Sequence, residues 1–198
     1  NGCGGDVWCS VNKYNSDLIS EEGVSIRAVK RVYKELSGDN SELTPKDIYD
    51  IAEGEKKGDQ QAAIDAFEAL GRVAGFTIAE SLNIVDGIVV LGGGISKAYK
   101  YILSAMINEM HGTRSMISGS IFPRLQMKVY NLMNDTEKNI FLKDESRLIQ
   151  ISGTDKKIKY NTEKKTGVIV SKIGASKAIA LGAYNYALNH LELDDCIK

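Results

Sequence analysis

Val-Val-Leu-Gly-Gly-Gly-Ile-Ser, residues 89–96, is the stretch that decides the fold of this chain. An apolar strand is predicted to end at three consecutive glycines, and a helix is expected to open directly behind them. Three glycines cost backbone entropy and pack no side chain, so the pattern indicates that a ligand approaches the main chain closely. The helix would offer unpaired N–H groups and a positive dipole end to an anion. We therefore interpret this stretch as part of a nucleotide site.

Helical patterns dominate the sequence before the glycines, and strand patterns are frequent after them. Apolar spacing and turn residues predict helices over 20–36, 45–52, 59–82 and 97–111, and strands over 6–11, 88–91, 127–132, 147–151, 157–160 and 167–171. Thr44-Pro45 is a typical helix start, and Gly38 is a typical helix end. Gly71 and Gly75 lie four residues apart, which favours close packing of two helices. This order of elements predicts an α/β fold with a mixed sheet and packed helices.

A second glycine feature lies near the end of the chain, at residues 171–188. Gly174 is expected to break a strand, and Ser176 to cap the helix that follows. Gly182-Ala183 leaves the middle of this helix almost bare. A bare patch admits either a neighbouring helix or a flat ligand.

Composition excludes several classes of protein. The chain of 198 residues has 25 basic and 26 acidic side chains, which gives no reason to expect a nucleic-acid or membrane partner. No apolar run approaches the ~18 residues of a membrane span. Three cysteines are too few and too scattered for a disulfide framework, so we expect a reducing, cytoplasmic setting. The chain begins at Asn1 and not at Met, inside a predicted loop, and we expect it to be a fragment.

The standard short motifs are absent. A dinucleotide fingerprint would need Gly or Ala where Lys97 stands, and a P-loop would need Gly-Lys-Ser/Thr. Cys3 and Cys9 are candidate metal ligands, but zinc takes four nitrogen or sulfur ligands and two thiols are too few, so we do not expect zinc. No serine–histidine–acid set has a recognisable spacing, and the catalytic residues stay unknown. The basic cluster around 156–165 is interpreted as a solvated hairpin.

The two glycine features together resemble a known family. A strand ending Leu-Gly-Gly-Gly-Ile-Ser, after an alanine-rich helix and the Leu-Asn-Ile-Val-Asp-Gly segment at 82–87, resembles the C-terminal half of ROK-family sugar kinases, most closely the glucokinase-like members. Ile173-Gly174, Ala178 and Gly182-Ala183 look like a later pattern of that family. The resemblance covers most of 1–112 and 167–190. Residues 113–166 look like an insertion.

This resemblance implies an actin-like, ribonuclease-H-type fold whose two lobes close on ATP, with Mg, and a hexose. Residues 1–198 would form the C-terminal lobe of an ATP-dependent hexose kinase that transfers the γ-phosphate to a sugar hydroxyl, and a homodimer is expected. The adenosine and phosphate side of the cleft would be formed by Gly92, Gly93, Gly94 and Ser96. The adenine wall would lie near Gly174, Ala178 and Gly182.

The sequence also departs from the family pattern. The spacing of Cys3 and Cys9 does not fit the family's cysteine knuckle, and its sugar-binding Glu would fall at Val11. The family's N-terminal lobe, with its phosphate loop and catalytic aspartate, is expected to be missing from this chain. We therefore expect the chain alone to show no catalytic turnover. Two alternatives remain: a sugar-responsive repressor of the same family, whose DNA-binding helix-turn-helix would lie outside this chain, and a non-catalytic dimerisation lobe.

Overall fold

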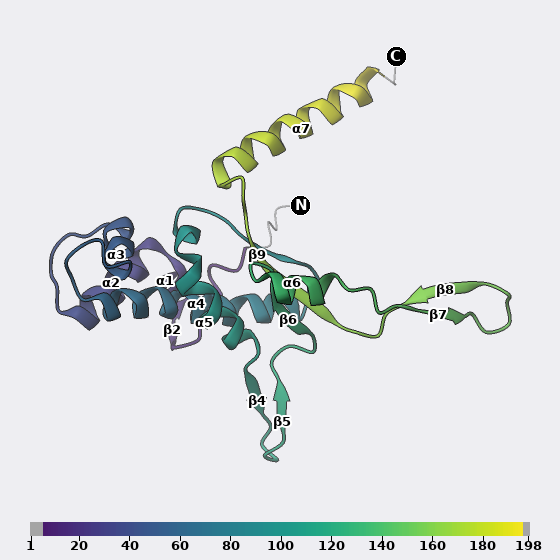
Figure 1. Ribbon diagram of the computed structural model, residues 1–198, viewed down its shortest axis with the longest axis horizontal. Coiled ribbons are helices and arrows are strands. Elements are labelled where there is room, and N and C mark those ends of the chain that lie inside the picture. Colours follow the sequence, from purple (N-terminus) through teal and green to yellow (C-terminus); the bar gives the residue numbers. More distant parts are fainter. Residues whose placement is uncertain (1–5, 196–198) are drawn as a thin grey trace.

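A computed structural model describes residues 6–195 of the chain and shows an α/β arrangement (Figure 1). The α/β class expected from the sequence is confirmed. In chain order the elements are β1 (Val11–Asn12), β2 (Asn15–Ile19), α1 (Glu21–Val24), α2 (Ile26–Ser37), α3 (Pro45–Ala52), α4 (Gln60–Leu82), β3 (Val89–Leu91), the 3₁₀ turn η1 (Ile95–Ala98), α5 (Tyr99–Met110), β4 (Thr113–Ser115), β5 (Ile121–Pro123), β6 (Lys128–Asn131), α6 (Asp135–Leu142), β7 (Arg147–Gln150), β8 (Lys157–Tyr160), β9 (Lys165–Val170) and α7 (Ala175–Asp195).

Helix α4 is the centre of the helical layer, and α2, α3 and α5 pack against it. Its buried face carries Phe67 and Leu70, which join the main apolar core. The close packing predicted from Gly71 and Gly75 is confirmed, because a Cβ at either position would run into the main chain of α5. Two helices can come this near only where one of them lacks side chains.

The main sheet has three parallel strands in the order β3–β9–β6. Val89 pairs with Val168, and Tyr130 pairs with Gly167. Strand β9 therefore joins two strands that precede it in the sequence, and its own Val168 is fully buried in the core. The antiparallel strands form separate hairpins, β1–β2, β4–β5 and β7–β8, so parallel and antiparallel pairings do not share one sheet.

Most helices begin and end where the sequence predicts. Thr44 and Asp47 form a complete capping box at the start of α3, with Pro45 in the first helical position. Gly38 ends α2 in the left-handed conformation, at φ 70°. The single helix predicted over 20–36 is wrong, because Ser25 adopts an extended conformation and its Oγ accepts a hydrogen bond from Ala28 N at 3.3 Å. Ser25, in the middle of the predicted helix, therefore caps the start of a separate helix, α2.

The strand predicted at 6–11 is also wrong. The first strand, β1, begins at Val11 and pairs with β2 in a short hairpin. Residues 7–10 form a turn whose carbonyls, at Val7 and Trp8, accept hydrogen bonds from the buried Ser20 hydroxyl. Ser20, the first residue of the helix predicted over 20–36, thus holds this turn in place and does not cap α1 with its side chain.

The region after α5 contains the strands expected from its sequence, and also the β4–β5 hairpin and the helix α6, which were not expected. The basic hairpin is confirmed as β7–β8, which projects from the body with β4–β5 (Figure 1). Strand β6 lies inside the predicted 113–166 insertion, yet its Val129 and Tyr130 are buried. This strand is therefore part of the core sheet, and the extent of an insertion stays a prediction.

Helix α7 extends away from the body of the molecule (Figure 1). It begins at Ala175, after Gly174 at φ 73°, so Ser176 lies inside the helix and not at its cap. Side chains along it, such as Ile179 and Tyr184, are exposed, and a Cβ at Gly182 would meet no atom within 4 Å. Among the described residues, no other element packs on the bare patch at Gly182. Within residues 6–195, no helix has the length and apolar character needed to cross a membrane.

Candidate functional site

The three glycines after β3 form an open turn. Gly93 has φ 91°, a conformation that side chains with a Cβ rarely adopt. A Cβ built at Gly92, Gly93 or Gly94 would meet no atom within 4 Å, so no neighbouring side chain fills this turn. Ser96 closes it from the other side, because its Oγ donates a hydrogen bond of 2.7 Å to Gly93 O. The main chain at 92–94 is therefore held in place and open to its surroundings.

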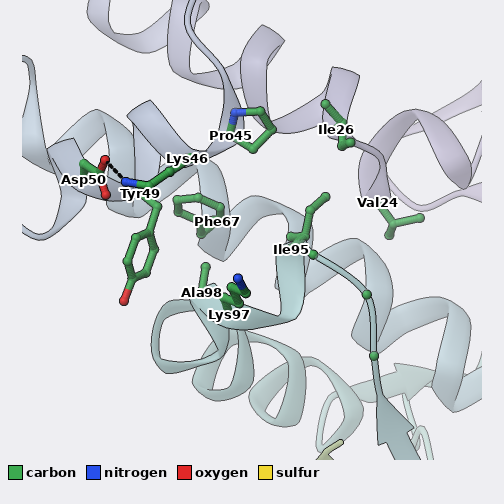
Figure 2. Close-up of a pocket in the computed structure, with 13 residues that line it drawn as sticks. Val24, Ile26, Pro45, Lys46, Tyr49, Asp50, Phe67, Ile95, Lys97 and Ala98 are labelled. Atoms are coloured by element: carbon green, nitrogen blue, oxygen red, sulfur yellow. Dashed lines mark hydrogen bonds and ion pairs between the residues drawn. The ribbon is translucent and has the colours of Figure 1, made fainter. Parts of the chain in front are cut away.

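These glycines line a cavity of about 720 Å³ (Figure 2). A cavity of this size is in the range of small-molecule and cofactor sites. The lining comes from α1 and the start of α2, from α3, from α4, and from the turn with η1. It consists of Val24, Ile26, Pro45, Lys46, Tyr49, Asp50, Phe67, Gly92, Gly93, Gly94, Ile95, Lys97 and Ala98.

Most of the cavity wall is apolar. Phe67 is buried behind it, and its ring stacks on Tyr101 at 6.2 Å between centroids and meets Tyr49 edge-on at 6.3 Å. These aromatic contacts fix the wall, because each ring is held by two others. A flat heteroaromatic group fits such a lining better than a strongly hydrated one.

Charged side chains around the cavity are mostly paired. Lys46 Nζ lies 2.5 Å from Asp50 Oδ2, one helical turn away on α3 (Figure 2). Behind the wall, Lys100 Nζ lies 2.5 Å from Glu53 Oε2. The Lys97 ammonium group makes no ion pair and no hydrogen bond with any other residue that the structure describes. The charged side chains on the cavity lining are thus the paired Lys46 and Asp50 and the unpaired Lys97.

The Glu53 carboxylate organises the end of α3 next to the cavity. It accepts hydrogen bonds from Lys100 and, at 3.0 Å, from the Tyr101 hydroxyl. The hydrogen bond from Lys100 is the largest of the effects that lower the pKa of Glu53 below its usual 4.5, and burial opposes it. Burial, followed by the hydrogen bond to Glu53, raises the pKa of Tyr49 and of Tyr101. Both phenols therefore stay neutral hydrogen-bond donors at physiological pH.

The structure brings together only part of the predicted site. Gly92, Gly93 and Gly94 lie on the cavity, and Ser96 supports their turn. Gly174, Ala178 and Gly182 do not line the cavity; Gly174 directly precedes the projecting α7, and the other two lie within it. Nucleotide contact by any of these residues stays a prediction. The helix expected directly behind the glycines begins as the short 3₁₀ turn η1, and the α-helix α5 starts only at Tyr99.

The candidate metal ligands do not form a site within the described residues. Cys9 is exposed with a free thiol, and Cys3 lies outside residues 6–195. Within that range, no group of three or more His, Cys, Asp or Glu side chains could hold a metal ion.

The side chains opposite the glycines were not predicted from the sequence. Helix α3 was expected, but nothing in its sequence places Lys46, Tyr49 and Asp50 across a cavity from the Gly92–Gly94 turn. Phe67 was expected as a core residue only. The one available signal was the short apolar face of α3, which shows that the helix packs but not against which element.

Comparison with known proteins identifies a solved structure that resembles this chain along nearly its whole length. A glucokinase from Parabacteroides distasonis is 45% identical, with a TM-score of 0.84, over 94% of this chain and 50% of its own. A protein from Cytophaga hutchinsonii, described as a putative sugar kinase, is 23% identical over 56% of this chain and 38% of its own; its TM-score of 0.47 is too low to support an argument. No family model matches the sequence, and no curated protein matches it.

The similarity to the Parabacteroides distasonis glucokinase confirms the resemblance predicted from the sequence, to a glucokinase-like sugar kinase. The chain spans half the length of the glucokinase that it matches.

Proposed function

Because the chain resembles a glucokinase over 94% of its length, we propose that it is the nucleotide-binding lobe of an ATP-dependent hexose kinase with an actin-like fold. The observation that carries this proposal is the open turn at Gly92–Gly94 on the wall of the cavity. Its main chain is accessible to a ligand, as the phosphate or ribose of a nucleotide requires. A sugar-responsive repressor or a ligand-free dimerisation lobe would not need this accessibility.

Each part of the cavity has a role in this proposal. The apolar wall around Phe67 and Ile95 holds the base and excludes water from it. The glycine turn lets the main chain approach the polar part of the nucleotide, and Ser96 keeps the turn in shape. Phosphoryl transfer depends on positioning and charge stabilisation, and this lobe contributes the position of the donor.

The described residues offer no cluster of ligands for Mg²⁺, so we assign no step to a metal on this chain. We also assign no catalytic base, because among residues 6–195 the cavity is lined by no carboxylate apart from the paired Asp50. The group that orients the sugar hydroxyl is expected in a part of the kinase outside the described residues.

Nucleotide binding tests the site directly. A valine at Gly92 would not collide with the protein, since no atom lies within 4 Å of a Cβ there, but it would occupy the cavity in front of the turn. We expect Gly92→Val to fold normally and to lose at least tenfold in ATP affinity, measured by calorimetry on the chain. Unchanged ATP affinity in a folded Gly92→Val variant would refute the site.

The kinase activity needs its own test, in the complete protein that contains residues 1–198. We expect ADP release only when a hexose is added, and we expect Gly92→Val to abolish it. ATP consumption that does not depend on any hexose would contradict the proposed activity while leaving the nucleotide site in place.

A further inference from the structure

Lys97 is the feature of the cavity that the proposed function does not explain. We propose that its ammonium group binds a phosphate of the nucleotide, and this inference rests on the proposed nucleotide site. Lys97 lies three residues after Gly94, in the turn η1 that follows the glycines, and it lines the same cavity. A cation therefore lies next to the open main chain of the Gly92–Gly94 turn.

The neighbouring cations all have partners, which sets Lys97 apart. Lys46, on the opposite side of the cavity, is held by Asp50 at 2.5 Å (Figure 2). Lys100, three residues after Lys97, is held by Glu53 at 2.5 Å and lies over the ring of Tyr101. Among the described side chains, no carboxylate lies within ion-pair distance of Lys97. The lining therefore carries one uncompensated positive charge.

An anion is the ligand that this charge selects. The paired Lys46 and Asp50 contribute no net charge, so the cavity as a whole is cationic by Lys97 alone. Lys97 is an exposed residue on the cavity lining, so its ammonium group is accessible to an incoming anion. An ammonium group binds phosphate oxygens through short charge-assisted hydrogen bonds.

The arrangement also separates the two ends of the nucleotide. Lys97 and the glycine turn belong to one continuous segment, 92–97, whereas the paired Lys46 and Asp50 lie on α3 across the cavity (Figure 2). When the phosphate binds at 92–97, the base lies against the apolar wall. The edge of the base then faces the hydrogen-bond donor Lys46 and the acceptor Asp50 on α3. Lys97 is then a residue that distinguishes nucleotides from nucleosides.

Calorimetric titration of the 198-residue chain with adenosine, AMP, ADP and ATP tests this assignment. We expect Lys97→Gln to weaken ADP binding about tenfold, which is the usual loss for one hydrogen bond to a charged group, and to leave adenosine binding unchanged. Lys97→Arg keeps the charge and should retain most of the ADP affinity. The control is Lys157→Gln, which removes the same charge from the exposed β8 strand of a projecting hairpin and should change neither affinity.

The outcomes distinguish the two claims. If the unmodified chain binds no nucleotide, the proposed nucleotide site is wrong. If it binds ADP and Lys97→Gln binds ADP equally well, only the role of Lys97 is wrong. An equal loss of adenosine and ADP affinity would also overturn the role, because it would place Lys97 at the base. Inorganic phosphate, added as a competitor, should displace ADP but not adenosine if the Lys97 subsite accepts phosphate from any source.

Discussion

Gly71 on α4 lies directly against Ile102 on α5: a Cβ at Gly71 would stand 2.5 Å from the Ile102 carbonyl oxygen. The same relationship recurs one turn later, where a Cβ at Gly75 would collide with the carbonyl of Met106. Helix α5 is continuous with η1 and the glycine turn, so the depth at which α5 packs on α4 also sets the position of the cavity wall.

Replacing Gly71 by alanine should therefore destabilise the protein. Alanine favours a helix over glycine by about 1 kcal/mol, but overpacking at a fixed main-chain atom costs about 1–3 kcal/mol. We expect a net loss of about 1–2 kcal/mol in the free energy of unfolding, measured by urea denaturation. The control is Gly182→Ala on α7, where the added Cβ meets no atom within 4 Å and stability should stay equal or rise. Equal effects at both positions would contradict the close contact.

The Tyr33 hydroxyl joins α2 to the start of α4. Tyr33 is buried, and its oxygen accepts a hydrogen bond of 3.2 Å from Asp59 N, the residue that caps α4. Tyr33→Phe keeps the ring and removes the acceptor, so we expect a loss of about 1 kcal/mol in unfolding free energy. Tyr14→Phe, at an exposed tyrosine, should have no measurable effect. Thermal unfolding of the two variants side by side decides the matter.

Glu109 holds two cations at the junction of the β1–β2 hairpin, α5 and the β4–β5 hairpin. Lys13 Nζ lies 2.5 Å from Oε2, and Arg124 Nη2 lies 3.0 Å from Oε1, with the Glu109 and Arg124 side chains only 9% and 8% exposed. Removing one charge from a buried pair leaves the other uncompensated, which costs about 3 kcal/mol.

Glu109→Gln should accordingly lower the free energy of unfolding by about that amount. Its control is Glu68→Gln, which breaks the exposed pair with Arg72 and should cost less than about 0.5 kcal/mol. A similarly small loss for Glu109→Gln would show that the junction contributes little to stability.

Acid should weaken the packing beside the cavity through Glu53. The hydrogen bond from Lys100, together with those from Tyr101 and Tyr49, lowers its folded-state pKa below the usual 4.5. A carboxyl whose pKa is lower in the folded state stabilises the fold above its unfolded pKa, and this contribution disappears as the pH falls through the folded value. We therefore expect part of the acid-induced loss of stability below about pH 4.5 to come from Glu53.

The Glu53→Gln variant should be less stable than the unmodified chain at neutral pH, and the difference should shrink on acidification. Denaturant titrations between about pH 3 and pH 7 measure this difference. Asp155→Asn, in the exposed turn between β7 and β8, serves as the comparison and should give a profile parallel to that of the unmodified chain. A pH-independent effect of Glu53→Gln would mean that packing, and not charge, is what the residue contributes.

Local features of this protein were readable from its sequence because their causes lie within a few residues. The capping box at Thr44 and Asp47 and the left-handed Gly38 each depend on neighbouring backbone groups, and so does the strand that ends at the Gly92–Gly94 turn. The same locality explains the error at Ser25, where a side chain that fits a helix interior also fits a cap, and the tertiary fold selected the cap.

The cavity was decided by tertiary structure alone. Strand β9 inserts between β3 and β6, and α4 lets α5 approach at Gly71; together they bring the glycine turn opposite α3. The Lys46–Asp50 pair and the unpaired charge of Lys97 belong to one site only because this packing places the glycine turn opposite α3. The sequence by itself determined that a main-chain segment would be left bare at residues 92–94. Only the packing of elements distant in the chain determined what faces it, because contacts between distant elements depend on the shape of the whole core.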